Sequence, residues 1–215
     1  MIYLDNAATV FPKPVGVINK MMEAYKSFGV SPGRGGYDLA VEASDLVMDV
    51  REHICRLFGG DNPERVIFAS NASDALNLII QGMIEPGCHV VSTRLEHNSV
   101  LRQLHHCQKN GIITYDLVDF DSHGCIDPED IAKAIKSTTK MVIINHASNV
   151  IGTVQDAQAI GNVCKKQGVP LILDVAQSAG LIPINMQEWG VSALAFTGHK
   201  SILGPSGIGG VVLAN

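Results

Sequence analysis

From about residue 65 onward, short apolar runs alternate with segments whose apolar positions recur every three or four residues. This alternation of strand-like and helix-like segments is typical of a mostly parallel sheet covered by helices. Several runs are apolar throughout, as expected for strands that are buried on both faces. We therefore predict an α/β fold with a mostly parallel seven-stranded sheet, its strands at residues 65–69, 89–92, 114–118, 141–145, 171–174, 194–196 and 209–213.

The first sixty residues follow a different pattern. Helical periodicity predicts two helices, at residues 15–28 and 38–58. The segment between them, at residues 31–36, is rich in glycine and proline, which indicates a loop. Further along, Asp127 followed by Pro128 has the form of a helix N-terminus. The two helices predicted at residues 15–28 and 38–58 thus precede the sheet.

Composition narrows the class of protein. The 215 residues are 46% hydrophobic, enough for one sizeable globular domain with a buried core. The net charge of −5, with scattered basic residues, argues against nucleic acid as the main partner. No apolar run approaches the roughly 20 residues that cross a bilayer, and the chain opens without a signal-peptide pattern, so we expect a cytoplasmic protein without membrane contact. The five cysteines are widely spaced and predict neither a disulfide framework nor a metal site.

Two polar residues stand after strand-like runs, where ligands bind in open α/β sheets. Asp174 closes an apolar run, and burying its carboxylate is costly unless a cation or strong donors meet it. The same residue could instead cap a following helix. Lys200 follows the next run; partial burial would disfavour its ammonium form and make the amine available to a carbonyl carbon. The alternative is an exposed loop lysine.

Two further polar segments also come directly after predicted strands. The first predicted strand runs through small polar residues into a helix near Ser73, where free backbone N–H groups could bind a phosphate. Simple N-capping by Ser70, Asn71 or Ser73 explains these residues equally well. His97 comes after the second strand and could stack on a planar ring or move protons, although an ordinary loop histidine is common.

In order and spacing, these segments resemble the cysteine desulfurase-like group of the class-V aminotransferases, which are fold-type I pyridoxal-phosphate enzymes. The resemblance covers the whole chain. It is carried by Tyr3-Leu4-Asp5-Asn6-Ala7-Ala8-Thr9, Ser31-Pro32-Gly33-Arg34-Gly35-Gly36, Glu96-His97-Asn98-Ser99, Asn145-His146-Ala147-Ser148-Asn149-Val150-Ile151-Gly152, Asp174-x-x-Gln177 and Thr197-Gly198-His199-Lys200.

The resemblance implies a role for each matched residue. Lys200 would hold pyridoxal 5′-phosphate as a Schiff base and move the Cα proton of the substrate. Asp174 would pair with the pyridinium nitrogen, so that the ring acts as an electron sink. His97 would stack on the ring, with Asn149 and Gln177 hydrogen-bonding around it.

The phosphate group would be held by residues from two segments. These are the Ala72 and Ser73 amides, the Ser73 hydroxyl, Thr197 and His199. Two departures from the family pattern concern this region and its neighbour. Asn71-Ala72-Ser73 stands where a threonine-rich turn is usual, and His97-Asn98 stands where a doubled histidine is common.

For function, the resemblance implies a cysteine desulfurase, which converts L-cysteine to L-alanine and passes sulfur through a protein cysteine to an acceptor protein. Family members are homodimers with active sites near the subunit interface. We expect residues 1–60 to belong to the substrate-side small region and residues 61–215 to form the cofactor-binding large domain. The attacking cysteine and the arginine that binds the substrate carboxylate lie in the family's C-terminal part, which we expect to be absent here.

Other functions stay open. Selenocysteine lyase, an aminotransferase proper or a racemase-like activity would use the same cofactor. A non-catalytic binding domain with an empty site is the alternative from a different class. A nicotinamide-dependent enzyme is disfavoured, because no G-x-G-x-x-G pattern opens a helix after an early strand.

Overall fold

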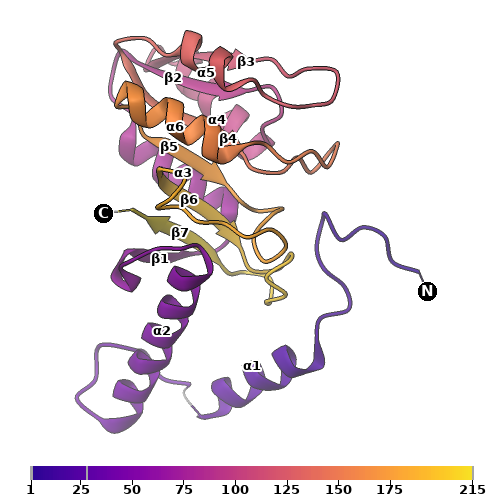
Figure 1. The fold of residues 1–215 in the computed structure, drawn as a ribbon. Helices are drawn as coiled ribbons and strands as arrows, with labels where there is room; N and C mark the ends of the chain where they lie inside the picture. Colours follow the sequence, from indigo (N-terminus) through magenta and orange to yellow (C-terminus); the bar gives the residue numbers. More distant parts are fainter. Residues whose placement is uncertain (1, 28, 215) are drawn as a thin grey trace.

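The computed structural model describes residues 2–27 and 29–214, and it places one seven-stranded sheet between two layers of helices (Figure 1). The strands are β1 Val66–Ala69, β2 Cys88–Thr93, β3 Ile113–Val118, β4 Thr139–Asn145, β5 Leu171–Asp174, β6 Val191–Thr197 and β7 Gly209–Leu213. The helices are α1 Val15–Ser27, α2 Asp38–Leu57, α3 Ala72–Met83, α4 Asn98–Lys109, α5 Pro128–Ala134 and α6 Ala157–Gln167, with a short 3-10 turn, η1, at Pro63–Arg65.

The strands follow the order β1-β7-β6-β5-β4-β2-β3. The pairs from β6 through β5, β4 and β2 to β3 are parallel, whereas β7 is antiparallel to both β6 and β1. The mostly parallel α/β fold is thus confirmed, and β5 and β7 have the predicted bounds. Strand β6 begins at Val191, three residues before the predicted start at Leu194, because Val191 and Ala193 already pair with β5. Strand β1 begins one residue late, since Arg65 belongs to η1.

The predicted helical segments and their boundaries also agree closely. Helix α2 ends at Leu57, and Phe58 follows as its C-cap. Helix α1 is described to Ser27, so the predicted end at residue 28 lies outside the described residues. Asp127 caps α5 by accepting a hydrogen bond from the backbone N–H of Glu129, as the sequence indicates.

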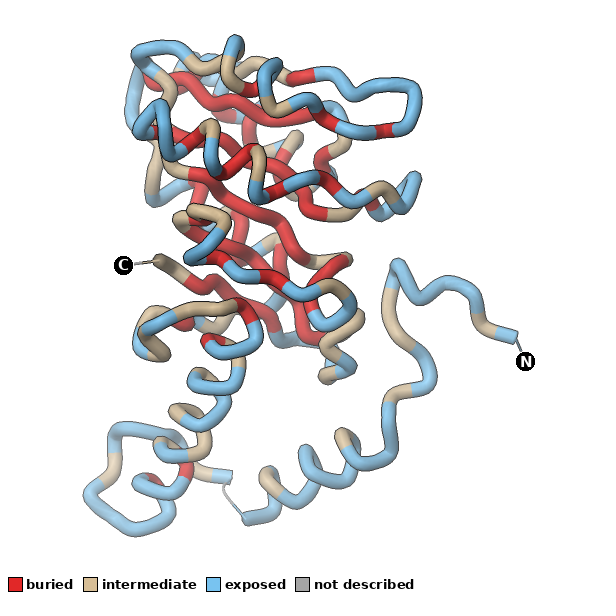
Figure 2. The backbone as a smooth tube through the Cα atoms, viewed as in Figure 1, coloured by how far each residue is buried: buried red, intermediate tan, exposed pale blue. Residues whose placement is uncertain are grey.

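Apolar side chains fill both faces of the sheet. Helices α3 and α4 pack on one face, and the end of α2 with α5 and α6 packs on the other. Every residue of β2 and β5 is buried, as expected for strands covered by helices on both faces (Figure 2). Four cysteines belong to this interior and Cys125 is exposed, and all five are free thiols.

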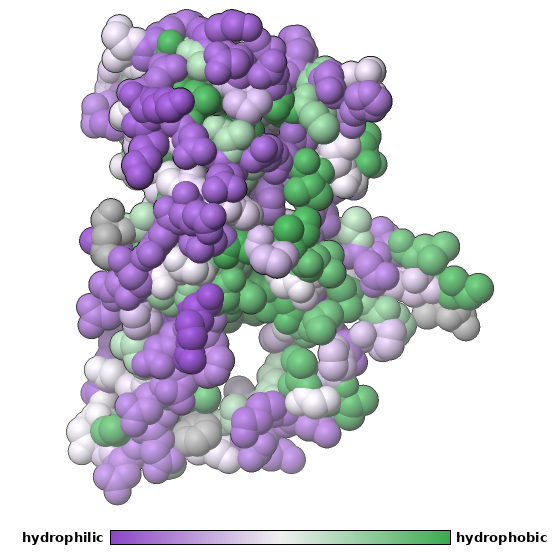
Figure 3. All heavy atoms as spheres, in the orientation of Figure 1, coloured by the Kyte–Doolittle hydropathy of each residue, from purple (hydrophilic) through white to green (hydrophobic). Residues whose placement is uncertain are grey.

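The N-terminal part packs much less. Helix α1 has no buried residue, and with the first turns of α2 it projects from the body of the protein (Figure 1). Exposed apolar side chains include Ile2 at 87% and Leu4 at 88% accessibility. Figure 3 shows hydrophobic residues on the N-terminal stretch that extends to the right of the view. Within the described part of the chain, no helix is long and apolar enough to cross a membrane.

The parallel strands bring four chain segments to one edge. Asn145, Asp174 and Ala195 are in register where β4, β5 and β6 run side by side. The N-terminus of α3 reaches the same edge because β7 lies close beneath it. At Gly209, an added Cβ would lie 2.6 Å from the Phe196 carbonyl oxygen and 2.7 Å from the Asn71 Cα atom. Only glycine therefore allows β7 to approach both segments.

We predict that Gly209→Ala lowers the free energy of unfolding by about 1 to 3 kcal/mol, because the methyl group must displace backbone atoms. The matched control is Gly82→Ala in α3, where an added Cβ meets nothing within 4 Å. This control should raise the free energy of unfolding by about 0.5 to 1 kcal/mol, since alanine is the better helix former. Urea unfolding measures both; equal midpoints for the two variants would contradict the packing described at β7.

Candidate active site

A cavity of about 540 Å³ opens at the carboxyl edge of the parallel strands. Its walls come from the N-terminal segment, from the start of α3, and from the loops after β2, β4, β5 and β6. All nine site residues expected from the sequence line it: Ala72, Ser73, His97, Asn149, Asp174, Gln177, Thr197, His199 and Lys200. The sequence reasoning did not assign the other lining residues to the site: Asp5, Ala7, Ala8, Asn71, Ser99, Asn145, Ala147 and Ala176.

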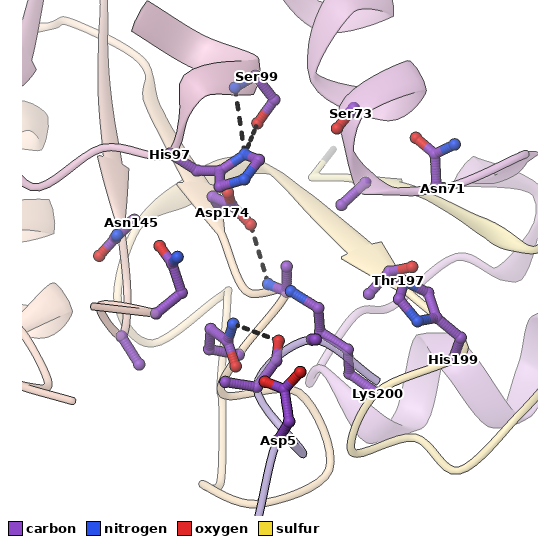
Figure 4. Close-up of a pocket in the computed structure, with 17 residues that line it drawn as sticks. Asp5, Asn71, Ser73, His97, Ser99, Asn145, Asp174, Thr197, His199 and Lys200 are labelled. Atoms are coloured by element: carbon purple, nitrogen blue, oxygen red, sulfur yellow. Dashed lines mark hydrogen bonds between the residues drawn. The ribbon is translucent and has the colours of Figure 1, made fainter. Parts of the chain in front are cut away.

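Lys200 lies in the turn that follows β6 and is partly buried. Figure 4 shows its side chain extending into the cavity toward Asp174. Burial lowers the pKa of the Lys200 amine, and the negative charge of Asp174 opposes this shift. A larger fraction of the amine is therefore neutral and nucleophilic than in an exposed lysine. The alternative of a solvated loop lysine does not fit this position.

Asp174 ends β5 and is 5% exposed. Burial raises the pKa of its carboxyl group, against the backbone N–H of Ala176 and the charges of His97 and Lys200, which lower it. The Ala176 N–H donates to Asp174 Oδ1 at 2.9 Å. No helix begins directly after Asp174, because residues 176–181 form turns, so the helix-cap alternative is wrong. A carboxylate in this position favours a cationic group in the cavity.

The opposite side of the cavity has donors for an anion. Asn71 caps α3 by accepting from the Asp74 N–H at 2.9 Å, which leaves the Ala72 and Ser73 amides without a hydrogen-bond partner among residues 2–27 and 29–214. In the same described set, the buried Thr197 Oγ1 also has no partner. Free N–H groups at a helix N-terminus beside an unpaired buried hydroxyl suit a phosphate group.

His97 lies at the start of α4 and serves as its N-cap. Its Nδ1 accepts from the Ser99 N–H at 3.1 Å and contacts Ser99 Oγ at 2.8 Å. Since a backbone N–H only donates, the neutral ring carries its proton on Nε2. Figure 4 shows the ring beside Asp174. Ser99 also comes soon after β2. The search for polar residues after strand-like runs, which selected His97, could therefore also have selected Ser99.

The N-terminal segment joins the two sides of the site. Gln177 Nε2 donates to the Ala7 carbonyl oxygen at 3.0 Å. Thr9 Oγ1 and Lys13 Nζ donate to the His199 carbonyl oxygen, Thr9 at 3.0 Å. These contacts join residues 170 to 190 positions apart. No local pattern predicts these contacts, although Asp5 and Ala7 belong to one of the segments that carry the family resemblance.

Comparison with known proteins identifies the family. The model of the family described as aminotransferase class-V matches residues 2–215. The chain belongs to the class-V aminotransferase family. As a class-V aminotransferase it is similar to a probable cysteine desulfurase of Methanothermobacter thermautotrophicus, with 34% identity over 97% of this chain and 52% of that protein. It is 37% identical to the cysteine desulfurase IscS of Histophilus somni, again over 97% of this chain and 52% of the relative.

Solved structures of the same kind superpose on the chain. The apo cysteine desulfurase of Thermococcus onnurineus matches with a TM-score of 0.91 and 30% identity, over all of this chain and 54% of that one. A structure of SspA in complex with cysteine matches with a TM-score of 0.92 and 28% identity, over 99% of this chain and 61% of that one. The chain therefore spans about half the length of the curated relatives that it matches.

Behind the cavity lies one buried carboxyl group that the sequence reasoning missed. Glu96 Oε1 accepts from Thr93 Oγ1 at 2.7 Å and from the Asn145 N–H at 3.0 Å. Glu96 Oε2 is buried and has no partner among the described residues. Burial raises the pKa of Glu96 from 4.5 to about 8, with Asp174 adding to the increase and the two hydrogen bonds opposing it. Glu96 is thus protonated at neutral pH, which leaves Asp174 as the negative group beside it.

This proton makes stability depend on pH. The folded chain holds it up to about pH 8, whereas the unfolded chain releases it near pH 4.5. Between these values the folded state binds more protons, so the free energy of unfolding falls as pH rises, by up to about 1.4 kcal/mol per pH unit from this group. We predict that Glu96→Gln removes this slope, while Glu42→Gln, at an exposed position of α2, keeps it.

Urea unfolding between pH 5 and pH 8.5 checks the effect of Glu96. Equal slopes for the wild type and Glu96→Gln would show that Glu96 is ionised in the folded chain.

Proposed function

We propose that the chain binds pyridoxal 5′-phosphate in this cavity and that Lys200 is the residue that would hold it through its amine. One arrangement carries the proposal: Lys200 and the buried Asp174 face the same cavity, opposite free donors at the start of α3. The class-V family to which the chain belongs generally depends on this cofactor.

The residues present fit each part of the cofactor. The Ala72 and Ser73 amides, with Thr197 Oγ1, offer its phosphate donors that are unpaired within the described part of the chain. Asp174 offers a buried negative charge to a protonated ring nitrogen. When bound, the cofactor supplies a ring that draws electrons from the substrate carbon attached to it.

The side chains of this chain hold and move protons around that ring. The lowered pKa of Lys200 lets its amine accept a proton from the substrate Cα and return it at neutral pH. Asp174 keeps the ring nitrogen protonated. His97 would cover one face of the ring, while Asn149 and Gln177 would orient its polar edge. The water-poor position of Asp174 strengthens its interaction with the ring nitrogen.

For the substrate we propose L-cysteine or a related amino acid, because relatives that match 97% of the chain are named cysteine desulfurases. A desulfurase needs a thiol to attack the substrate sulfur, and none of the five cysteines lines the cavity. We propose that this thiol, like the arginine for the substrate carboxylate, belongs to residues outside these 215. The sulfur would then pass to an acceptor protein.

The domain division and the assembly are proposals of the same kind. Residues 61–215 form the cofactor-binding domain, and residues 1–60 belong to the substrate side, which is supported by Asp5, Ala7 and Ala8 in the cavity wall. The exposed apolar side chains of α1 support a homodimer. Sedimentation equilibrium tests the dimer; a strictly monomeric chain at high concentration would argue against it.

We predict that the wild-type chain with added pyridoxal phosphate gains a visible absorption band and that Lys200→Ala does not. Borohydride should convert the wild-type adduct to a stable covalent modification of Lys200, which peptide mass spectrometry locates. Lys140→Ala, at a lysine paired with Glu85 away from the cavity, is the control and keeps the band. A folded wild-type chain without the band would favour a non-catalytic binding domain.

We also predict that the cofactor-loaded chain releases no sulfide from L-cysteine above the level given by free pyridoxal phosphate. The cavity holds the amine for the first bond but no thiol for the sulfur. A full-length relative serves as the positive control in a sulfide assay. Sulfide release that disappears in Lys200→Ala would overturn this assignment.

A further inference from the structure

The contacts of His199 determine where its ring carries a proton. Thr9 Oγ1 lies 3.0 Å from the His199 carbonyl oxygen and 3.1 Å from His199 Nδ1. In the first contact Thr9 Oγ1 is the donor, because a carbonyl oxygen has no hydrogen to give. The single hydroxyl hydrogen of Thr9 therefore points to the carbonyl oxygen, and the hydrogen between Thr9 Oγ1 and Nδ1 belongs to the histidine.

The neutral His199 ring thus has its proton on Nδ1 and a lone pair on Nε2. His199 lines the cavity, and Figure 4 shows its ring beside Thr197, on the side of Asn71 and Ser73 where the anion donors lie. A lone pair facing a phosphate oxygen would repel it. For Nε2 to donate to a phosphate, the ring must gain a proton, because Thr9 holds the existing one at Nδ1.

We propose that binding of a phosphate ester in this cavity is coupled to the uptake of one proton at His199 Nε2, and that Thr9 imposes this coupling. The proposal rests on the proposed function, since it assigns the protonation state of that same phosphate site. The proton comes from solvent, and binding forms an imidazolium that donates from both ring nitrogens, to Thr9 and to the phosphate.

The surroundings keep the ring neutral before the phosphate arrives. Burial lowers the pKa of His199, and the positive charges of Lys200 on its own loop and Lys13 on the N-terminal segment lower it further. The carboxyl groups of Asp5 and Asp174 also line the cavity. A bound phosphate dianion reverses the balance, because its negative charge favours the imidazolium.

Calorimetric titration with pyridoxine 5′-phosphate measures this uptake. Pyridoxine 5′-phosphate has no carbonyl carbon for Lys200, and pyridoxine is its matched control without the phosphate. The difference between the two, measured at pH 8 in buffers of different ionisation enthalpy, gives the protons taken up because of the phosphate. We expect about one per bound ester, since at this pH the free ester is a dianion.

Variants show which group takes the proton. His199→Asn can donate from its amide without protonation, so we expect the phosphate-dependent uptake to vanish. Thr9→Val frees the ring to place its proton on Nε2 and should reduce the uptake well below that of the wild type. Thr9→Ser keeps the hydroxyl and should match the wild type.

Nitrogen-15 NMR of the unliganded chain provides a readout independent of binding. The His199 signals, assigned by their loss in His199→Asn, should show the Nδ1–H tautomer. An Nε2–H tautomer would overturn the proposal even if a variant misfolds. So would ester binding without phosphate-dependent uptake, or uptake that persists in His199→Asn. Failure of the ester to bind at all would instead contradict the proposed cofactor site on which this proposal rests.

Discussion

The attraction between the buried Asp174 carboxylate and positive charge in the cavity is the interaction on which the rest of the site depends. A carboxylate at 5% exposure is costly unless a cation meets it, and among the described residues Asp174 has one neutral donor, the Ala176 N–H. The register of β4, β5 and β6 places this charge at the cavity floor. Glu96, just behind, stays protonated through burial, so Asp174 carries the negative charge at this place.

The two sides of the cavity separate two kinds of chemistry. The Asp174 side attracts positive charge, whereas the α3 side offers hydrogen-bond donors to negative charge. Lys200 lies between them on the loop after β6, with its pKa lowered by burial. The N-terminal segment contacts both sides, through Ala7 with Gln177 and through Thr9 with His199. A ligand with a cationic ring at one end and a phosphate at the other matches this division.

The sequence predicted the strand bounds and the site residues that depend on local residue patterns. Strands β5 and β7 have the expected bounds because each contains a short apolar run. The search for polar residues after such runs selected Asp174, Lys200 and His97, which all line the cavity. The contact of Thr9 with His199 spans 190 residues and leaves no local trace. Glu96 is polar in sequence, and only the folded structure shows the burial that keeps it protonated.

The state of the ring nitrogen in the bound cofactor tests this account most directly. Nitrogen-15 NMR of the chain loaded with ring-labelled pyridoxal phosphate reports whether that nitrogen carries a proton. We predict a protonated nitrogen in the wild type well above neutral pH and an unprotonated one in Asp174→Asn, with Asp116→Asn, at an aspartate paired with Lys136 outside the cavity, as the control that matches the wild type. An unprotonated nitrogen in the wild-type chain would contradict the account.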